Sequence, residues 1–265
     1  MQFRKLCAIA SAAVLAASFG VASAQQDNGQ NASNNASANG NSSYSITPAE
    51  LTETAYSAAG ILHGLMQRSA DKQIPQTLVN HARCIAVFPT VFKEGLIVAG
   101  SHGDGIVSCR NVAGDWQAPV FFDLSGGSVG LQAGAKVSDL IVLFMNKQAA
   151  QQLMDGNVDF GAKANVAAGP IGLHARAKTA PAPMVAYEIN SSGGFAGAEV
   201  KGTRISIDKP AMNKLYGKNA QPKQVLFHRS QAPSHVRIYN EALQKFAPTA
   251  EFVKNEIQIK AQTAK

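Results

Sequence analysis

The order of apolar and polar residues predicts a long helix that begins near residue 47. Thr47, Pro48 and Glu50 supply the parts of a helix start: a hydroxyl N-cap, a proline in the first turn and a glutamate that can bond back to the cap. Apolar residues then recur at helical spacing from Leu51 to Met66. We therefore expect an amphipathic helix over residues 47–70.

Shorter helices are expected before, within and after a strand-rich middle. Pro75 starts one that runs to Arg83, and residues 146–154 form another. Pro210 begins a short helical turn that reaches Tyr216. Apolar side chains then line one side of a helix that ends before Pro248, namely Val236, Tyr239, Leu243 and Phe246.

From residue 84 the apolar period changes to two, which indicates strands. Turn sequences such as Asp104-Gly105 and Gly114-Asp115 separate the runs, so we expect antiparallel hairpins and not βαβ units. The predicted strands cover residues 84–88, 95–100, 105–109, 118–122, 128–135, 139–145, 158–169, 171–177, 184–190, 193–200 and 203–208.

Helices, a run of strands and further helices predict an α+β domain. Glycine and alanine alternate with larger residues between Gly161 and Ala177. Glycine weakens a strand unless the sheet bends there or another element packs closely against it. We expect a large antiparallel β-sheet that is curled, in the extreme into a barrel-like shape. N-terminal and C-terminal helices should flank it. A helix packed tightly on a small-residue face would explain the same pattern.

Residues 1–24 have the pattern of a signal peptide. Arg4 and Lys5 precede an apolar run from Leu6 to Val21, and three small residues end at Ala24. The run is too short for a good membrane span. We expect cleavage near Ala24, export, and a mature protein that is periplasmic or associated with the outer membrane.

The remaining chain divides at about residue 46. Residues 25–45 are rich in Asn and Ser, and only Tyr44 could add much to a core. Such a segment cannot offset the entropy of ordering itself, so we expect a disordered tether. Residues 46–265 have the length and the regular short segments of a single domain.

Charge is unevenly distributed along the chain. From Lys201 onward there are 12 Lys or Arg against 4 Asp or Glu, whereas Gln25 to Val200 holds 10 against 13. A cationic C-terminal quarter indicates an anionic partner such as a lipid headgroup, while the alternative is solvated helix faces. The cations are scattered and no aromatic residues interleave with them, so we expect no nucleic-acid partner.

Two cysteines follow the predicted signal peptide, Cys84 and Cys109. Each lies in an apolar, strand-like run. In an oxidising compartment an even pair suggests a disulfide between neighbouring strands, and two buried free thiols are the alternative. A metal site would need more thiols or closely spaced histidines than the sequence supplies.

Two short patterns resemble catalytic motifs. Gly126, Ser128 and Gly130 have the G-x-S-x-G spacing of a hydrolase nucleophile, which must sit on a sharp turn between a strand and a helix. No helix is predicted after Ser128, so we interpret it as a strand residue beside a hairpin turn at Gly126, Gly127 and Gly130. Ser101, His102 and Asp104 have the side chains of a triad, but neighbouring positions rarely bring the histidine between the other two.

The sequence offers no anchor for a metal or a cofactor. The six histidines contain no H-x-H or H-x-x-x-H pair: His63, His81, His102, His174, His228 and His235. Neither a P-loop nor a dinucleotide-binding glycine motif that opens a helix occurs. We therefore expect no metal, no cofactor and no enzymatic activity, with a hydrolase that uses Ser128 as the least favoured alternative.

Several glycine motifs together resemble the SYLF family. They are CIAVFPTVFKEGLIVAGSHGDGIV from Cys84, the W-x-A-P-x-F-F pattern of Trp116–Phe122, GGSVGLQAGA from Gly126, VAAGPIG at 166–172 and GGFAGAEVKG at 193–202. The matches extend in order from about Leu51 to Tyr216. The resemblance implies a single α+β domain with an antiparallel sheet and flanking helices.

The resemblance also implies phospholipid binding, attributed in the family largely to an amphipathic N-terminal helix with basic residues. The helix from Thr47 to Ala70 has that position here but few cations. Actin association, found among fungal and animal relatives, is not expected, because this chain carries an export signal and lacks their accessory domains.

We therefore expect a non-enzymatic protein that binds anionic phospholipid headgroups at a membrane surface. A structural or protein-interaction module of the cell envelope, with an envelope protein as its partner, is the alternative. The candidate lipid-binding residues are Leu51, Leu62, Leu65, Met66, Arg68, Lys209, Lys214, Lys218, Lys223, Arg229, Arg237 and Lys245.

Overall fold

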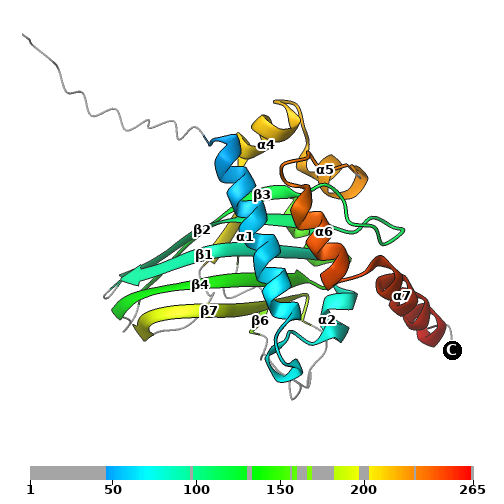
Figure 1. Ribbon diagram of the computed structural model, residues 1–265, viewed down its shortest axis with the longest axis horizontal. Coiled ribbons are helices and arrows are strands. Elements are labelled where there is room, and N and C mark those ends of the chain that lie inside the picture. The colour runs from blue at the N-terminus through cyan, green and yellow to red at the C-terminus, as the bar shows by residue number, and fades with distance from the viewer. Residues whose placement is uncertain are drawn as a thin grey trace, which may run out of the picture. The chain divides into compact units, whose positions relative to one another are not determined.

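A mixed α+β fold with an open, curled sheet is visible in the computed structural model (Figure 1). The structure describes residues 46–95, 98–129, 133–155, 157–159, 166–168, 182–196, 203–229 and 231–263. The predicted signal peptide, the tether, and most of the glycine-rich stretch from Gly161 to Ala177 lie outside the described residues. The predicted fold class is confirmed.

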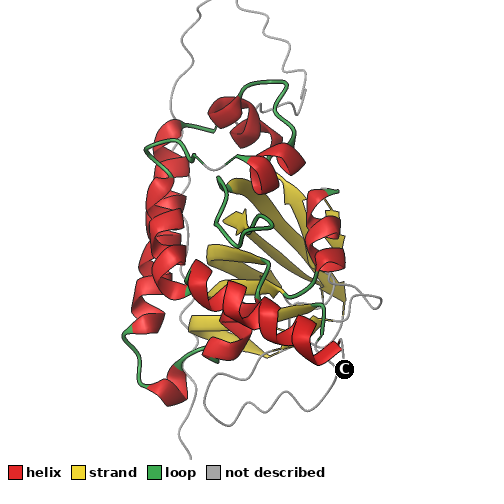
Figure 2. Cartoon of the chain, turned by 90° about the vertical axis from the view of Figure 1, so that its right-hand side faces the viewer, coloured by secondary structure: helices red, strands yellow, loops and turns green. Residues whose placement is uncertain are grey.

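Helices lie on several sides of the sheet (Figure 2). Among the described helices, none combines the length and the hydropathy needed to cross a bilayer. The helices are α1 (Pro48–Met66), a 3₁₀ turn (Ala70–Lys72), α2 (Gln76–His81), α3 (Lys147–Met154), α4 (Lys209–Tyr216), α5 (Pro222–His228), α6 (Arg237–Phe246) and α7 (Thr249–Thr263).

The sheet has the strand order β5-β8-β3-β2-β1-β4-β7-β6 within the described part of the chain. All neighbours are antiparallel except β6 and β7, and the order ends at β5 and β6, so the sheet is not closed into a barrel. The strands are β1 (Cys84–Gly95), β2 (Val98–Cys109), β3 (Val120–Val129), β4 (Ala133–Phe144), β5 (Asn157–Asp159), β6 (Val166–Ala168), β7 (Met184–Ala196) and β8 (Thr203–Ile207).

The start of α1 has the predicted capping box. The backbone N–H of Glu50 donates to Thr47 Oγ1 over 3.3 Å, and the backbone N–H of Thr47 donates to Glu50 Oε2 over 2.6 Å. Two of the donors that a helix leaves unsatisfied at its N-terminus are therefore bonded. The helix ends at Met66, four residues earlier than we predicted.

One face of the sheet is covered by α1 and α6, which lie side by side across it (Figure 1). Small residues of α1, Ala55, Ala58 and Ala59, are fully buried and let the neighbouring elements approach closely. On α6, the buried Tyr239 hydroxyl donates to the carbonyl of Ile85 in β1 over 2.9 Å. This bond anchors the C-terminal helix to the centre of the sheet.

The predicted turn at Asp104-Gly105 is wrong. Both residues lie inside β2, where they pair with Asp123 and Phe122 of β3. A glycine is needed at position 105 for a reason other than a turn. The buried ring of Phe88 occupies the space that a Cβ atom would fill. The predicted turn at Gly114 is confirmed, since this residue has a φ of 91° and follows the end of β2.

The strand predicted at 84–88 continues past Pro89 to Gly95, because a bulge accommodates this proline. The register of β1 shifts between Val87 and Phe92 against β2 and between Phe88 and Val91 against β4. Thr90 has a φ of 58° there, and its N–H donates to Asp139 Oδ1 over 3.0 Å. Proline is tolerated in a central strand at such a bulge, which also increases the local twist of the sheet.

Gly126 and Gly127 do not form the predicted hairpin turn. They lie inside β3 and pair with Ser101 and Gly100 of β2. Ser128 is a strand residue as we predicted, opposite Ala99. Gly130 lies outside the described residues.

The predicted disulfide between Cys84 and Cys109 is present. The two residues are direct partners at the start of β1 and the end of β2, and both are fully buried. The bridge therefore ties the two central strands together at the end of the sheet from which Arg110 and Asn111 continue.

Candidate functional site

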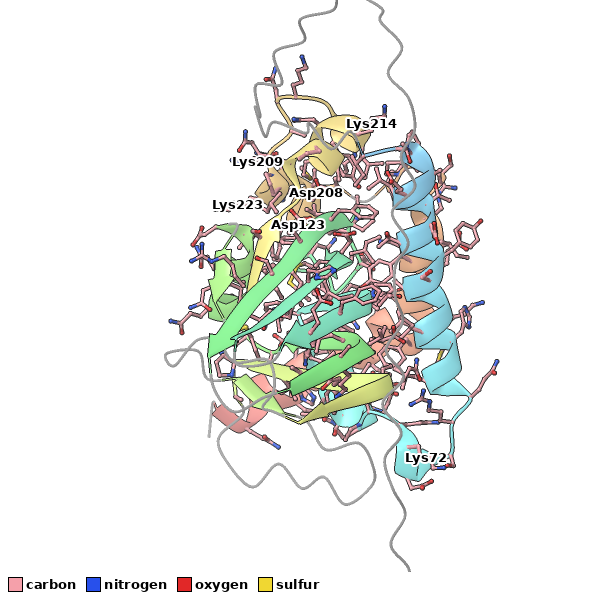
Figure 3. All side chains as sticks on the ribbon, turned by 90° about the vertical axis from the view of Figure 1, so that its left-hand side faces the viewer. Lys72, Asp123, Asp208, Lys209, Lys214 and Lys223 are labelled. Atoms are coloured by element: carbon pink, nitrogen blue, oxygen red, sulfur yellow. A yellow bond between two sulfur atoms is a disulfide. The ribbon has the colours of Figure 1, made fainter. Side chains whose placement is uncertain are left out.

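The predicted cations of the C-terminal quarter are exposed on α4, α5, α6 and the segments that connect them. Figure 3 shows Lys209, Lys214 and Lys223 together at one end of the domain and Lys72 at the opposite end. No ion pair involves the predicted cations of this quarter within the part of the chain that the structure describes. They are Lys209, Lys214, Lys218, Lys223, Arg229, Arg237 and Lys245, and we call them the cationic surface.

The predicted apolar lipid contacts on α1 are inside the core. Leu51, Leu62 and Leu65 are at most 1% exposed, and Met66 packs against the same cluster. The amphipathic pattern of α1 therefore reflects packing on the sheet and α6, and these side chains are not accessible to a lipid in this structure. Arg68, beyond the helix end, donates to the side-chain oxygen of Asn190.

A groove of about 690 Å³ lies on the cationic surface between α4 and α5. Arg229 lies over the ring of Tyr216, with its guanidinium carbon 4.8 Å from the ring centre. The Tyr216 hydroxyl donates to the carbonyl of Pro119 over 2.6 Å. Tyr216 is thus held by the residue before β3, and its ring gives the guanidinium of Arg229 a surface to pack on at the groove.

A second pocket, of about 600 Å³, lies between α3, α5 and the connection that follows β2. It combines cations with apolar side chains, and we call it the basic pocket. No carboxylate lines it within the described residues. The lining residues are Arg83, Arg110, Asn111, Val112, Gln117, Lys147, Ala150, Gln151, Met154, Lys223, Phe227 and His228.

Arg110 is a fixed part of the basic pocket. Its guanidinium donates to the carbonyls of Ala82 (3.2 Å), Gly114 (2.7 Å) and Ala247 (2.7 Å), which lie in three separate segments. The guanidinium carbon of Arg110 lies 4.1 Å from the centre of the Trp116 ring. Burial lowers the pKa of Arg110 to about 9, so the side chain stays cationic at neutral pH.

Arg83 lines the same pocket and is held from behind by the C-terminal helix α7. Glu256 of α7 accepts a hydrogen bond from Arg83 over 2.9 Å, and Phe252 lies beneath both arginines with ring-centre distances of 5.6 Å to Arg83 and 4.7 Å to Arg110. Both arginines are therefore held by the protein. Lys147 and Lys223 line the pocket without an ion pair in the described residues.

A third, smaller cavity is acidic. Asp104, Asp123 and Asp208 line about 300 Å³ beside the start of α1, together with Glu50. Burial raises the pKa of Asp123 to about 6, and the charges of Asp208 and Asp104 add to this shift. Asp208 also accepts a bond from the N–H of Ala211 over 2.9 Å as the N-cap of α4.

The structure does not assemble the catalytic patterns of the sequence. Ser128 lies inside β3 and not on a turn between a strand and a helix. Ser101 and His102 are consecutive residues of β2, so their side chains point to opposite faces. His102 instead stacks on Phe92, with ring centres 5.3 Å apart. No group of three potential metal ligands comes together among the described residues.

The lining of the basic pocket contains residues that sequence reasoning missed. Lys147, Met154 and Phe227 were not candidates, although Lys147 begins a predicted helix. The helix α5 was also missed, and Pro222 in its first turn was the signal that could have predicted it. The pocket itself forms where α3 meets α5, 68 residues later, and no local pattern predicts that contact.

The family assignment comes from comparison with known proteins. Residues 125–246 match the family model described as "Ysc84: Las17-binding protein actin regulator". The chain is 29% identical over 196 residues to Protein YSC84 of Saccharomyces cerevisiae, an alignment that covers 70% of this chain and 42% of the yeast protein. The chain therefore contains a match to the Ysc84, or SYLF, family domain and is similar to members of that family over most of its length. The resemblance identified from the glycine motifs is therefore confirmed.

Other SYLF relatives show the same degree of similarity. LAS seventeen-binding protein 3 of S. cerevisiae is 29% identical over 199 residues, or 71% of this chain and 43% of the relative. The human SH3 domain-containing YSC84-like protein 1 is 29% identical over 212 residues, or 77% of this chain and 61% of the relative. The chain thus spans less than two thirds of these relatives. No solved structure matches the chain.

Proposed function

We propose that this SYLF protein is a non-enzymatic phospholipid-binding protein that associates with anionic headgroups at a membrane surface. The observation that carries the proposal is the cationic surface, whose side chains are exposed on neighbouring helices and make no ion pair in the described residues. Unpaired cations near a bilayer attract anionic lipids at about 1 kcal/mol each. Lys209, Lys214 and Lys223 lie together at one end of the domain, so they could act on the same membrane (Figure 3).

The mode of binding that we propose is electrostatic and peripheral. The apolar face of α1 is buried against the sheet, so no described part of that face is free to insert into a bilayer. The groove beside Tyr216 and Arg229 offers a recess where a headgroup phosphate could reach the guanidinium that packs on the Tyr216 ring. Residues 1–24 support a location in the cell envelope, periplasmic or at the outer membrane.

Vesicle flotation of the purified protein tests this function. We expect association with vesicles that contain phosphatidylglycerol and none with purely zwitterionic vesicles at low salt. Raising the salt concentration should release the protein, because exposed charges are screened within about 8 Å at physiological ionic strength. Equal recovery on both vesicle types, or no recovery on either, would contradict the proposal.

A protein-interaction module is the second candidate. It is favoured by the family description, which names a Las17-binding protein, and by the relative called LAS seventeen-binding protein 3. For this chain the partner would be another protein of the envelope. Crosslinking in intact cells followed by mass spectrometry would favour this candidate if one protein partner is recovered while vesicle flotation is negative.

A further inference from the structure

We propose that the basic pocket binds one anionic amphiphile with a single acyl chain, through a carboxylate or phosphate head near Lys147 and Lys223. The two lysines come from α3 and α5 and line the same cavity of about 600 Å³. The site shares only Lys223 with the cationic surface, and it shares His228 with the groove between α4 and α5. It extends the proposed function from a bilayer surface to a monomeric lipid.

The charge of the pocket favours an anion. Lys147 and Lys223 have no carboxylate partner in the described residues, and no carboxylate lines the pocket. Arg110 lines the same pocket and is cationic at neutral pH, although its own donors are bonded to backbone carbonyls. A cationic ligand would therefore be repelled, and a neutral one would leave the lysines unpaired.

The apolar part of the lining favours an amphiphile over a small inorganic anion. Ala150 and Met154 of α3 and Phe227 of α5 line the same cavity as the lysines. Its volume falls within the range of pockets that enclose organic ligands. Burying an acyl chain against such side chains contributes about 0.8 kcal/mol for each methylene removed from water, a gain that phosphate alone cannot obtain.

The intrinsic fluorescence of Trp116 provides a readout at this site. Trp116 is the single tryptophan of the chain and is 7% exposed; it does not line the pocket itself but packs against Arg110, which does. Purified protein is titrated with palmitate, with monopalmitoyl lysophosphatidate and with neutral monopalmitin, each below its micellar concentration. The first two compare a carboxylate with a phosphate head, and monopalmitin tests the need for charge.

We expect saturable binding of at least one anionic probe and affinity roughly tenfold lower for monopalmitin. Lys147→Gln should weaken binding of the anionic probe roughly fivefold to tenfold, and Met154→Gln should weaken binding of all three probes. The matched control is Lys214→Gln, which removes the same charge from α4 outside the pocket and should change affinity by less than about twofold. Circular dichroism confirms that each variant is folded.

Three results would overturn the inference: no saturable binding of either anionic probe, equal affinity for monopalmitin, or equal effects of Lys147→Gln and Lys214→Gln. Phosphate alone, titrated in parallel, should not compete at millimolar concentration, and full competition would likewise contradict the need for an acyl chain. Vesicle flotation separates this inference from the proposed function, because Lys147→Gln should leave flotation unchanged whether or not the pocket binds palmitate.

Discussion

Gly105 is required by the ring of Phe88, which crosses the backbone of β2 at this point. A Cβ atom built on Gly105 would overlap three atoms of that ring, and Phe88 is fully buried in β1 with no room to move. At Gly100, in the same strand, a Cβ atom meets nothing within 4 Å. The two glycines therefore have different physical roles although they share one strand.

Gly105→Ala should lower the free energy of unfolding by about 1–3 kcal/mol, because the added methyl overpacks the core. Gly100→Ala is the matched control and should change stability by no more than about 0.5 kcal/mol. Urea denaturation followed by circular dichroism measures both. Equal stabilities for the two variants would show that the Phe88 ring can adapt.

Asp123 holds its proton more tightly in the folded protein than in the unfolded chain. Burial is the main cause of its raised pKa of about 6, and Asp208 and Asp104 across the acidic cavity add to it. Between about pH 4 and pH 6 the folded state therefore binds more protons than the unfolded state. Stability should fall as the pH rises through this window.

Asp123→Asn should reduce that pH dependence, and Asp208, whose pKa burial also raises, should supply what remains of it. The variant should be more stable than the parent protein at pH 7 to 8 and of similar stability near pH 3, where Asp123 is mostly protonated in both states. Denaturant midpoints measured across this pH range provide the test. Asp155→Asn, at the exposed end of α3, should keep the slope of the parent, and a parent protein without any slope would contradict the assignment.

The helix α1 is the element that the sequence specifies most completely. Its capping box, its first-turn proline and its apolar spacing are local, and each appears in the structure as predicted. The pattern did not reveal what the apolar face contacts, since an amphipathic stripe serves a core and a membrane equally well. Burial of Leu51, Leu62 and Leu65 assigns the stripe to the core.

Thr47→Ala should lower stability by about 1 kcal/mol, because the N–H of Glu50 loses its acceptor and the reciprocal bond is weakened. Thr54→Ala on the same helix is the control. The Thr54 hydroxyl donates to the carbonyl of Glu50 over 3.0 Å, a bond that competes with helix geometry, so this variant should be neutral or slightly stabilising. A larger loss for Thr54→Ala would contradict the capping account.

At the scale of the whole domain, the fold class followed from the sequence but the sheet order did not. Hairpin reasoning accounts for the neighbours β1-β2 and β2-β3, whereas β4 crosses to the other side of β1 and β8 returns to β3. These pairings join segments far apart in the chain, and no local period encodes them. The same limitation hid the basic pocket, because its lysines meet only after α3 and α5 pack.

The uneven distribution of lysines along the sequence corresponds to an uneven distribution in the folded domain. Lys209, Lys214 and Lys223 lie at one end of the domain, and Lys72 lies at the other (Figure 3). If the cationic surface binds anionic lipid, the position of a lysine must matter and not only the net charge. Two double variants with the same loss of charge can separate these effects.

The most direct test compares Lys209→Gln/Lys214→Gln with Lys72→Gln/Lys254→Gln in flotation with phosphatidylglycerol vesicles at low salt. All four lysines are exposed, and each pair lowers the net charge by two. We predict that the first pair weakens association roughly thirtyfold, at about 1 kcal/mol for each lysine near the surface, and that the second pair changes it by less than about twofold. Equal losses for the two pairs would contradict a defined lipid-binding surface on α4, α5 and α6.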